Sequence, residues 1–179
     1  LGFVMIDSDY YKAFSEPYGP QAGDDCLKQV AQTVEAVDAT VVEVIQDLVD
    51  TMVDSGHSVG VAAPQIGVLR RILVVDVSKS KLGKENNHGL LEMVNPEIIE
   101  NSGSKMMREG CMSVPDYTGN VTRAEHIVVE FTDRAGRLRV IEASGFEAVA
   151  IQHELDHLDG LLFLDRVSSL KTDLYRRKS

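Results

Sequence analysis

The stretch that decides how this chain is interpreted is Gln152-His153-Glu154-Leu155-Asp156-His157. In a helix, His153 and His157 project from one face one turn apart, so both imidazoles can bind the same metal ion. Glu154 can then reach a water on that ion without being a ligand itself. This combination is typical of metal-dependent hydrolases, in which the ion acidifies a water and a carboxylate moves its proton.

The residues before this stretch predict that it is buried. Phe146, Val149 and Ile151 give the segment an apolar side, and glycines at 145 and 160 bound it. We therefore expect a buried helix from Gly145 to near Gly160 that carries both imidazoles. The alternative is a surface helix with two incidental histidines.

Composition restricts the class of protein. A chain of 179 residues with 44% hydrophobic and 26% charged residues suits one soluble domain, with or without a short appendage. The net charge of −10 argues against nucleic-acid binding, sequence-specific or general. No apolar run is long enough to span a membrane. Two cysteines, Cys26 and Cys111, are too few for a disulfide framework and favour a cytoplasmic location.

Helices and strands are expected to mix without regular alternation, which favours an α+β fold. Helices are predicted over residues 24–33 and 39–53, at the metal-binding stretch, and in a tail that closes with Arg176, Arg177 and Lys178. Strands are predicted over residues 1–6, 71–77, 91–96, 98–100, 126–132 and 138–143, the last two joined by a hairpin turn. Residues 60–67 are expected to form a non-helical loop.

A catalytic metal site needs a third protein ligand, and Cys111 is the best candidate. It follows Gly110, which allows close approach of the backbone, and a divalent ion readily binds a thiolate. The alternative is that Cys111 is a small buried hydrophobic residue.

The loop from Gly60 to Gly67 is built from small residues, so a substrate backbone could lie beside it. Gln65 offers an amide N–H that could meet a developing oxyanion. An ordinary tight turn with a solvated glutamine is the alternative.

Together, residues 58–65, 109–113 and 152–157 resemble the three motifs of peptide deformylases: Gly-x-Gly-Leu-Ala-Ala-Pro-Gln, Glu-Gly-Cys-Leu-Ser and Gln-His-Glu-x-Asp-His. They occur in the family's order and at compatible spacing, over roughly residues 34–178. The resemblance implies an α+β fold with mixed or antiparallel sheets around a central metal-binding helix.

The resemblance also implies roles for individual residues. Cys111, His153 and His157 would bind the metal, with water as the fourth ligand. Glu154 would be the general base and then the acid, and Gly60 would border the substrate. Gln65 and the backbone N–H of Met112 would stabilise the oxyanion. The reaction implied is removal of the formyl group from N-formylmethionine of new polypeptides, with Fe²⁺ as the usual ion and Ni²⁺, Co²⁺ or Zn²⁺ as substitutes.

Three positions depart from these motifs. Ser58 stands where the family usually has glycine, and its side chain would narrow the cleft if that position needed a positive φ. Val61 and Met112 replace leucines, and Met112 conserves volume.

The N-terminus departs further. Residues 1–34 resemble the opening of a diguanylate-cyclase (GGDEF-type) domain, in which the residues matching Asp7, Ser15 and Asp24 would bind Mg²⁺ and guanine. The signature loop is absent, and the segment is too short to bury a core of its own. We therefore expect no cyclase activity, and divide the chain into an atypical N-terminal segment (1–33) and a deformylase-like catalytic domain (34–179). Residues 7–23 are expected to be loosely held.

Three readings of function remain open from the sequence. The first is an active deformylase, and the second is a zinc peptidase of the His-Glu-x-x-His type, which leaves Cys111 and Gln65 unexplained. The third is a deformylase-like module without activity. The basic tail of Arg176, Arg177 and Lys178 is interpreted either as a solvated helix end or as a docking site for the ribosome.

Overall fold

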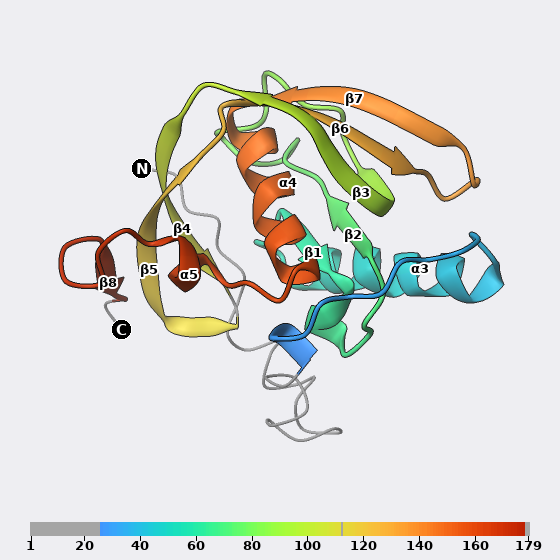
Figure 1. Ribbon diagram of the computed structural model, residues 1–179, viewed down its shortest axis with the longest axis horizontal. Helices are drawn as coiled ribbons and strands as arrows, with labels where there is room; N and C mark the ends of the chain where they lie inside the picture. Colours follow the sequence, from blue (N-terminus) through green and yellow to red (C-terminus); the bar gives the residue numbers. More distant parts are fainter. Residues whose placement is uncertain (1–25, 112, 178–179) are drawn as a thin grey trace.

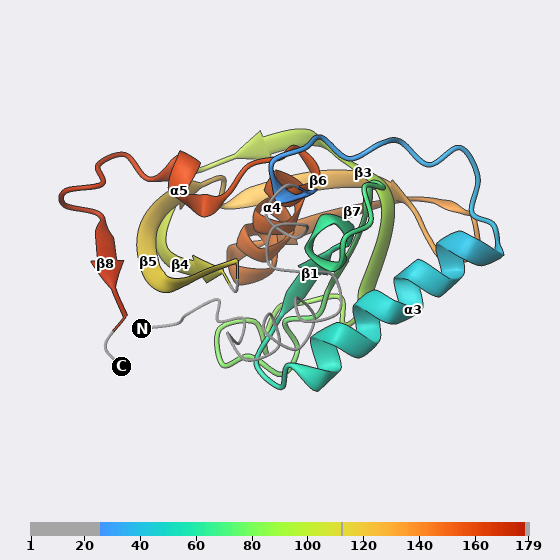
Figure 2. The ribbon, with the colours of Figure 1, turned by 90° about the horizontal axis from the view of Figure 1, so that it is seen from below.

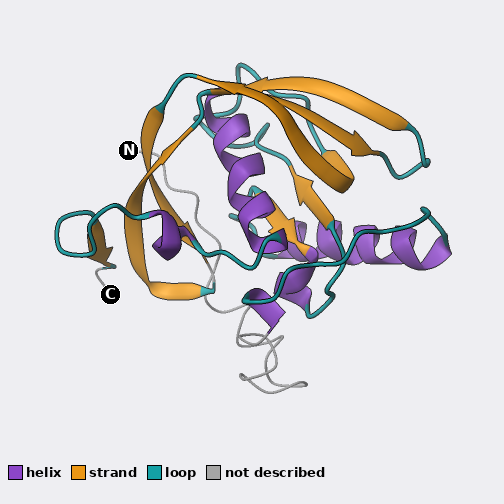
Figure 3. Ribbon diagram, viewed as in Figure 1, coloured by secondary structure: helices purple, strands orange, loops and turns teal. Residues whose placement is uncertain are grey.

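Two antiparallel sheets surround one buried helix, α4 (Gly145–Leu158), in the computed structural model (Figures 1 and 3). The structure describes residues 26–111 and 113–177. The strand expected at residues 1–6 and the loose segment at 7–23 therefore lie outside the described residues. The α+β fold with antiparallel sheets around a central helix, expected from the sequence, is confirmed.

The larger sheet has five strands in the order β1-β2-β3-β6-β7, and every neighbouring pair is antiparallel. Its strands are β1 (Gly60–Ala62), β2 (Ile72–Val75), β3 (Leu91–Ser102), β6 (His126–Thr132) and β7 (Leu138–Ser144). Strands β6 and β7 form the hairpin that the alternating sequence predicted. Strand β1 is an edge strand, and it lies at the start of the loop that was expected to border a substrate.

The smaller sheet has the order β4-β5-β8, from β4 (Lys105–Cys111), β5 (Val114–Arg123) and β8 (Leu174–Arg176). Gly103, at φ 72°, lies in the short turn that passes the chain from β3 into β4. The two sheets are therefore connected directly, and they lie on different sides of α4 (Figure 2). Cys111 stands at the end of β4 that faces this helix.

Strand alternation explains why two helices cover opposite faces of the larger sheet. On β2, Ile72 and Val74 pack with α3 (Ala39–Asp54), whereas Leu73 and Val75 pack with the core that includes α4. Helix α3 is amphipathic and buries Val41, Ile45, Leu48, Thr51 and Met52, as its sequence periodicity predicted. Its first turn is capped by Asp38, whose Oδ1 accepts from the Val41 N–H.

Helix α4 is buried almost all round, as expected for a helix enclosed by sheets. Its fully enclosed positions include Ile151, His153, His157 and Leu158. It ends where Gly160 takes φ 72°, and a Cβ there would lie 2.9 Å from the Lys28 carbonyl oxygen. The backbone of residues 28–29 thus packs closely against the end of α4.

The helix predicted at residues 24–33 is wrong for most of its described part. Only Cys26 and Leu27 are helical, after which the chain runs over the end of α4. The Ala31 N–H donates to the Leu158 carbonyl, and Gln32 forms a parallel bridge with Arg70. These tertiary hydrogen bonds replace the local ones that a helix would have made.

Two further predictions are corrected. Residues 60–67 are not a plain loop: β1 is followed by a 3₁₀ turn, η1 (Ala63–Ile66). The expected helical tail is a single helical turn, α5 (Phe163–Arg166), followed by strand β8, which pairs with β5. Arg176 therefore ends a strand, so the helix-dipole explanation of the basic tail does not apply to it. Lys178 lies outside the described residues.

Candidate metal centre

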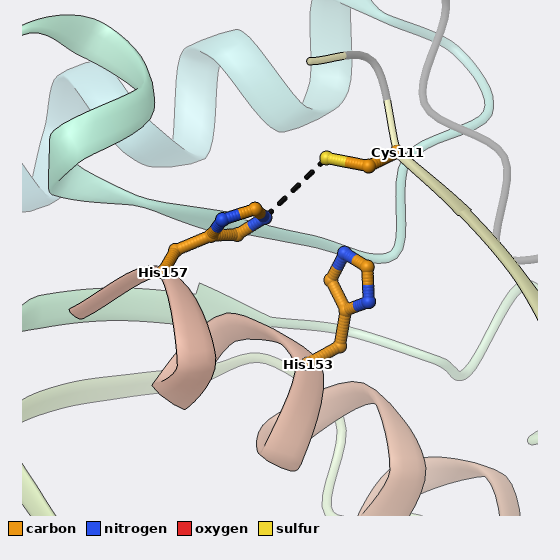
Figure 4. Close-up of side chains that lie close together, drawn as sticks. All are labelled: Cys111, His153 and His157. Atoms are coloured by element: carbon orange, nitrogen blue, oxygen red, sulfur yellow. Dashed lines mark hydrogen bonds between the residues drawn. The ribbon is translucent and has the colours of Figure 1, made fainter. Parts of the chain in front are cut away.

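Cys111, His153 and His157 converge on one point inside the protein (Figure 4). The two histidines come from successive turns of α4, and the cysteine comes from the end of β4. All three side chains are buried, and one potential ligand atom from each lies within 4.8 Å of the others. The Cys111 Sγ stands 3.4 Å from the His157 Nε2.

This spacing fits a shared metal ion. Ligand atoms at about 2.0–2.3 Å from a tetrahedral ion lie roughly 3.5 Å from one another. Among the described residues, the buried Nε2 of His153 has no hydrogen-bond partner, which is costly unless another group takes its lone pair. One thiolate and two imidazoles are ligands that Fe²⁺, Zn²⁺, Co²⁺ and Ni²⁺ all accept.

The orientation of His153 is fixed from its other nitrogen. Its Nδ1 lies 2.9 Å from the Glu109 Oε2, so the Nδ1–H donates to a carboxylate and Nε2 is left free. A metal-binding histidine is commonly held in this way, because the second hydrogen bond selects the tautomer and aims the ring.

Glu109 is in turn held by Arg123. The Arg123 Nε and Nη2 donate to the two Glu109 oxygens at 2.5 and 2.8 Å, and its Nη1 donates to Asp156 at 2.9 Å. Burial raises the pKa of Glu109, but the hydrogen bonds from Arg123 and His153 outweigh it and lower that pKa to about 2. Burial lowers the pKa of Arg123, but the carboxylates of Glu109 and Asp156 outweigh it and hold that pKa above its usual value.

The cysteine and histidines also shift one another's pKa values. Burial raises the pKa of the Cys111 thiol, but the interactions with His157 and His153 outweigh it and hold that pKa well below its usual range. Burial lowers the pKa of His153, yet its contacts with Cys111 and Glu109 hold that pKa well above the ordinary value. The cluster therefore favours a thiolate at Cys111, the form that binds metals.

Glu154 is buried next to this cluster, and neither carboxylate oxygen has a hydrogen-bond partner among the described residues. Burial raises the pKa of Glu154 to about 7, although the charges of His153 and His157 oppose the rise. A carboxyl group with a pKa near neutrality can both accept and release a proton at physiological pH.

Gln65 reaches the cluster from η1. Its Oε1 accepts from the Ala62 N–H at 2.9 Å, and its Nε2 lies 3.8 Å from the Cys111 Sγ. The first hydrogen bond fixes the amide, so the Nε2–H₂ donor faces the cluster of Cys111, His153 and His157. Gln65 is buried rather than solvated, which contradicts the alternative of an ordinary surface turn.

Gly60 packs directly on Glu154. A Cβ at position 60 would meet the Cγ and Oε1 of Glu154 at 2.8 Å, so only glycine leaves room for this carboxylate. Ser58 does not have the positive φ that would have narrowed the cleft, since Asn95 is the one non-glycine residue with positive φ in the described part. Its Oγ donates to the Gly60 carbonyl at 2.7 Å.

The structure thus brings together Gly60, Gln65, Cys111, His153, Glu154 and His157, as the sequence predicted. Met112, expected to supply a backbone N–H, lies outside the described residues. Sequence reasoning assigned no role to Glu109, Arg123 or Asp156. Glu109 could have been found from its place two residues before Cys111, but no local signal marks Arg123 as its partner.

Comparison with known proteins points to one family. The sequence profile described as polypeptide deformylase matches residues 20–173. The peptide deformylase of Thermodesulfovibrio yellowstonii is 41% identical over 155 residues, covering 87% of this chain and 91% of that protein. Peptide deformylase 1 of Bacillus subtilis is 41% identical over 149 residues, covering 83% of this chain and 88% of that protein.

Solved structures agree with these sequence matches. The peptide deformylase of Legionella pneumophila is similar with a TM-score of 0.73 and 41% identity, covering 83% of each chain. The peptide deformylase of Ehrlichia chaffeensis in complex with actinonin gives a TM-score of 0.76 and 36% identity, covering 83% of this chain and 86% of that chain. The family match begins at residue 20, inside the N-terminal segment, and none of these matches supports the expected resemblance of that segment to a diguanylate cyclase.

Proposed function

This chain belongs to the polypeptide deformylase family, and we propose that Cys111, His153 and His157 are the protein ligands of its catalytic divalent metal. It is a metal-dependent hydrolase that removes the N-formyl group from N-formylmethionyl peptides and releases formate. The observation that carries the ligand assignment is the convergence of one sulfur and two imidazoles within 4.8 Å. The unpartnered Nε2 of His153 supports it.

We propose Fe²⁺ as the native ion, with Zn²⁺, Ni²⁺ or Co²⁺ as substitutes, because the thiolate and imidazole ligands suit all four. A divalent ion in this site supplies a Lewis acid that makes a water more acidic and polarises a carbonyl group. Elemental analysis of protein purified without oxygen tests the identity of the native ion.

Glu154 serves as the general base and then as the general acid. Its carboxylate is buried beside the ligands and has no competing hydrogen bond, so it is free to take the proton of the attacking water. The water oxygen bonds to the formyl carbon, the carbon–nitrogen bond breaks, and Glu154 returns the proton to the amine. Formate and a free N-terminus are the products.

The oxyanion that forms in this reaction is stabilised by the Gln65 Nε2–H₂ and by the backbone N–H of Met112. Gln65 supports this assignment because its other amide atom is anchored to the Ala62 N–H, which removes rotational freedom before the reaction. Gly60 borders the substrate. Its contact with Glu154 places the β1 edge next to the proton-transfer group.

The experiment that tests this function measures formate release from a formyl-Met-Ala-Ser peptide by the metal-loaded protein. Formate release that depends on the metal supports the deformylase. Cleavage of the peptide bond without formate would instead favour a zinc peptidase, and metal binding without turnover would favour a module without activity. Gln65 beside Cys111 argues against the peptidase, which gives neither residue a role.

New polypeptides as substrates lead to two further proposals, a cytoplasmic location and docking to the ribosome through Arg176, Arg177 and Lys178. Arg176 is exposed at the end of β8, and the Arg177 N–H donates to the Asp116 carbonyl. Co-sedimentation with ribosomes at low salt, lost when the three residues are neutralised, would support docking. None of the helices in the described part is long and apolar enough to cross a membrane.

The division into a segment of residues 1–33 and a domain of residues 34–179 stays a proposal. In either case Leu27 and Ala31 are buried against the domain, so the described end of the segment contributes to its packing. We propose that the cyclase-like residues carry no cyclase activity. Incubation of the full chain with GTP and Mg²⁺ should give no cyclic dinucleotide.

A further inference from the structure

A row of charged side chains leads from the metal centre to the protein surface. The Glu109 carboxylate binds His153, and Arg123 binds both Glu109 and Asp156. Asp156 is then held by Arg166, whose Nη2 donates to Oδ1 at 2.8 Å and whose Nε donates to Oδ2 at 3.2 Å. Beyond His153, Glu109 comes from β4, Arg123 from β5, Asp156 from α4 and Arg166 from α5, so one network connects the smaller sheet with α4 and α5.

Burial is unequal along this row. The side chains of Glu109, Arg123 and Asp156 are 0%, 4% and 7% exposed, whereas that of Arg166 is 47% exposed. The network contains two carboxylates and two guanidinium groups. Among the described residues, Arg123 and Arg166 are the two guanidinium groups that pair with Asp156, so the outermost member of the network is one of the two cations on a buried carboxylate.

We propose that Arg166 is a positioning residue for the metal centre, which it influences through Asp156, Arg123 and Glu109. This inference rests on the proposed ligand role of His153. Arg166 holds Asp156 in the place where it accepts from the Arg123 Nη1. Arg123 can then direct its remaining N–H groups to Glu109, and Glu109 aims the His153 ring.

Arg166 can influence Glu109 because the two buried carboxylates, Glu109 and Asp156, both pair with Arg123. Without Arg166, Arg123 is the one guanidinium group of the network left to pair with both Glu109 and Asp156, and a buried carboxylate that loses a partner is costly. Asp156 would then move or draw Arg123 towards itself, and the fork that fixes Glu109 would loosen. A looser Glu109 leaves the His153 ring less well oriented, which weakens metal binding.

The experiment compares the metal affinity of the full-length wild type with that of two Arg166 variants. Arg166→Met removes the charge and the fork while retaining the apolar stem, and Arg166→Lys retains the charge alone. The dissociation constant for Co²⁺ is measured by competition with a chelator. We expect it to rise on the order of tenfold in Arg166→Met, the lower end for residues that support a metal ligand, and less in Arg166→Lys. At saturating Co²⁺, kcat should stay near the wild-type value.

Arg71→Met is the matched control. Arg71 also pairs with an aspartate near the end of α4, donating from Nη1 to the Asp159 Oδ1 at 2.8 Å. Asp159 is not linked to Glu109 by any hydrogen bond in the described residues, so this variant should bind Co²⁺ as the wild type does. An equal loss of affinity in both variants would mean that pairing at the helix end matters only for general stability, and would overturn the proposal.

A second measurement tests the route of the effect. In an Asp156→Asn background, Arg166→Met should weaken Co²⁺ binding much less than in the wild type, because the connection is already broken. Fully additive effects, or an unchanged dissociation constant in Arg166→Met, would overturn the proposal. Failure of the ligand assignment is distinguishable, since Cys111→Ala would then keep its metal. If Arg166→Met does not fold, the dissociation constants for Co²⁺ of Arg166→Lys and Arg71→Lys are compared instead, and only Arg166→Lys should bind Co²⁺ more weakly than the wild type.

Discussion

A Cβ atom on Gly60 would stand 2.8 Å from both the Cγ and the Oε1 of Glu154. Both are inside normal contact distance, so any side chain at position 60 must displace the proposed proton-transfer group. The glycine in this motif is therefore required by the carboxylate opposite it, and not by backbone conformation, since its φ is not among the positive ones.

Gly60→Ala should lower kcat on the order of 10²-fold, because a shift of about 1 Å in a catalytic group has an effect of this size. The metal ligands are not touched by the change, so metal content should stay equal to that of the wild type. Formate release and elemental analysis of the same sample check both parts. An active Gly60→Ala protein would show that Glu154 can move aside without cost.

Cys111→Ala should lose most of the bound metal, because it removes the only sulfur in the ligand cluster. Cys26→Ala is the control, since Cys26 is not part of that cluster. Elemental analysis of the two purified proteins gives the result. Equal metal content in both variants would refute the ligand set.

Glu154→Gln should keep the metal and lose on the order of 10²-fold or more in rate, the usual contribution of a general acid–base group. Its carboxylate is buried without a partner, so replacing it with a neutral amide should not lower the melting temperature. Formate release and thermal unfolding of the metal-loaded variant test both expectations. Near-normal formate release would show that another group is the base.

Gln65→Glu separates the two functions of Gln65. A glutamate retains an oxygen for the Ala62 N–H but lacks the N–H₂ donor that faces Cys111. We expect kcat to fall on the order of 10²- to 10³-fold, the typical loss when one oxyanion donor is removed. The KM for the formyl peptide should change much less. A rise in KM with unchanged kcat would assign Gln65 to substrate binding instead.

Acid should weaken the fold through Glu109. Its pKa in the folded protein is about 2, lower than the ordinary value of 4.5. The stabilisation from ionised Glu109 is therefore complete above about pH 4.5 and disappears as the pH falls towards 2, with a size on the order of 3 kcal/mol. Urea unfolding of metal-free wild type and Glu109→Gln should converge over this range. A constant difference between them would contradict the assignment.

Local signals in the sequence were enough for several elements. Helix α3 was predicted over residues 39–53 from apolar residues at helical spacing, and the β6–β7 hairpin follows from alternation around a turn. The i, i+4 spacing of His153 and His157 already placed both imidazoles on one helical face. Each of these features depends on residues close in the chain, where geometry is set by the backbone alone.

Other elements depended on partners far along the chain. Strand β3 was expected as two pieces, residues 91–96 and 98–100, yet pairing with β6 carries it through two register shifts. The Asn95 side chain, from a backbone at φ 50°, accepts from the Val34 N–H and donates to the Val34 carbonyl. The tail forms strand β8 instead of a helix because β5 offers it a free edge.

The sequence by itself was enough to propose the metal ligands, since three short motifs carry them in a recognisable order. Only the tertiary structure decided what supports them. Glu109, Arg123 and Asp156 meet because two strands and a helix are packed together, and buried charges of opposite sign are stable only when such packing aligns them. No local pattern records that alignment: Glu109 and Asp156 lie within the recognised motifs, but nothing near Arg123 in the chain marks it as their partner.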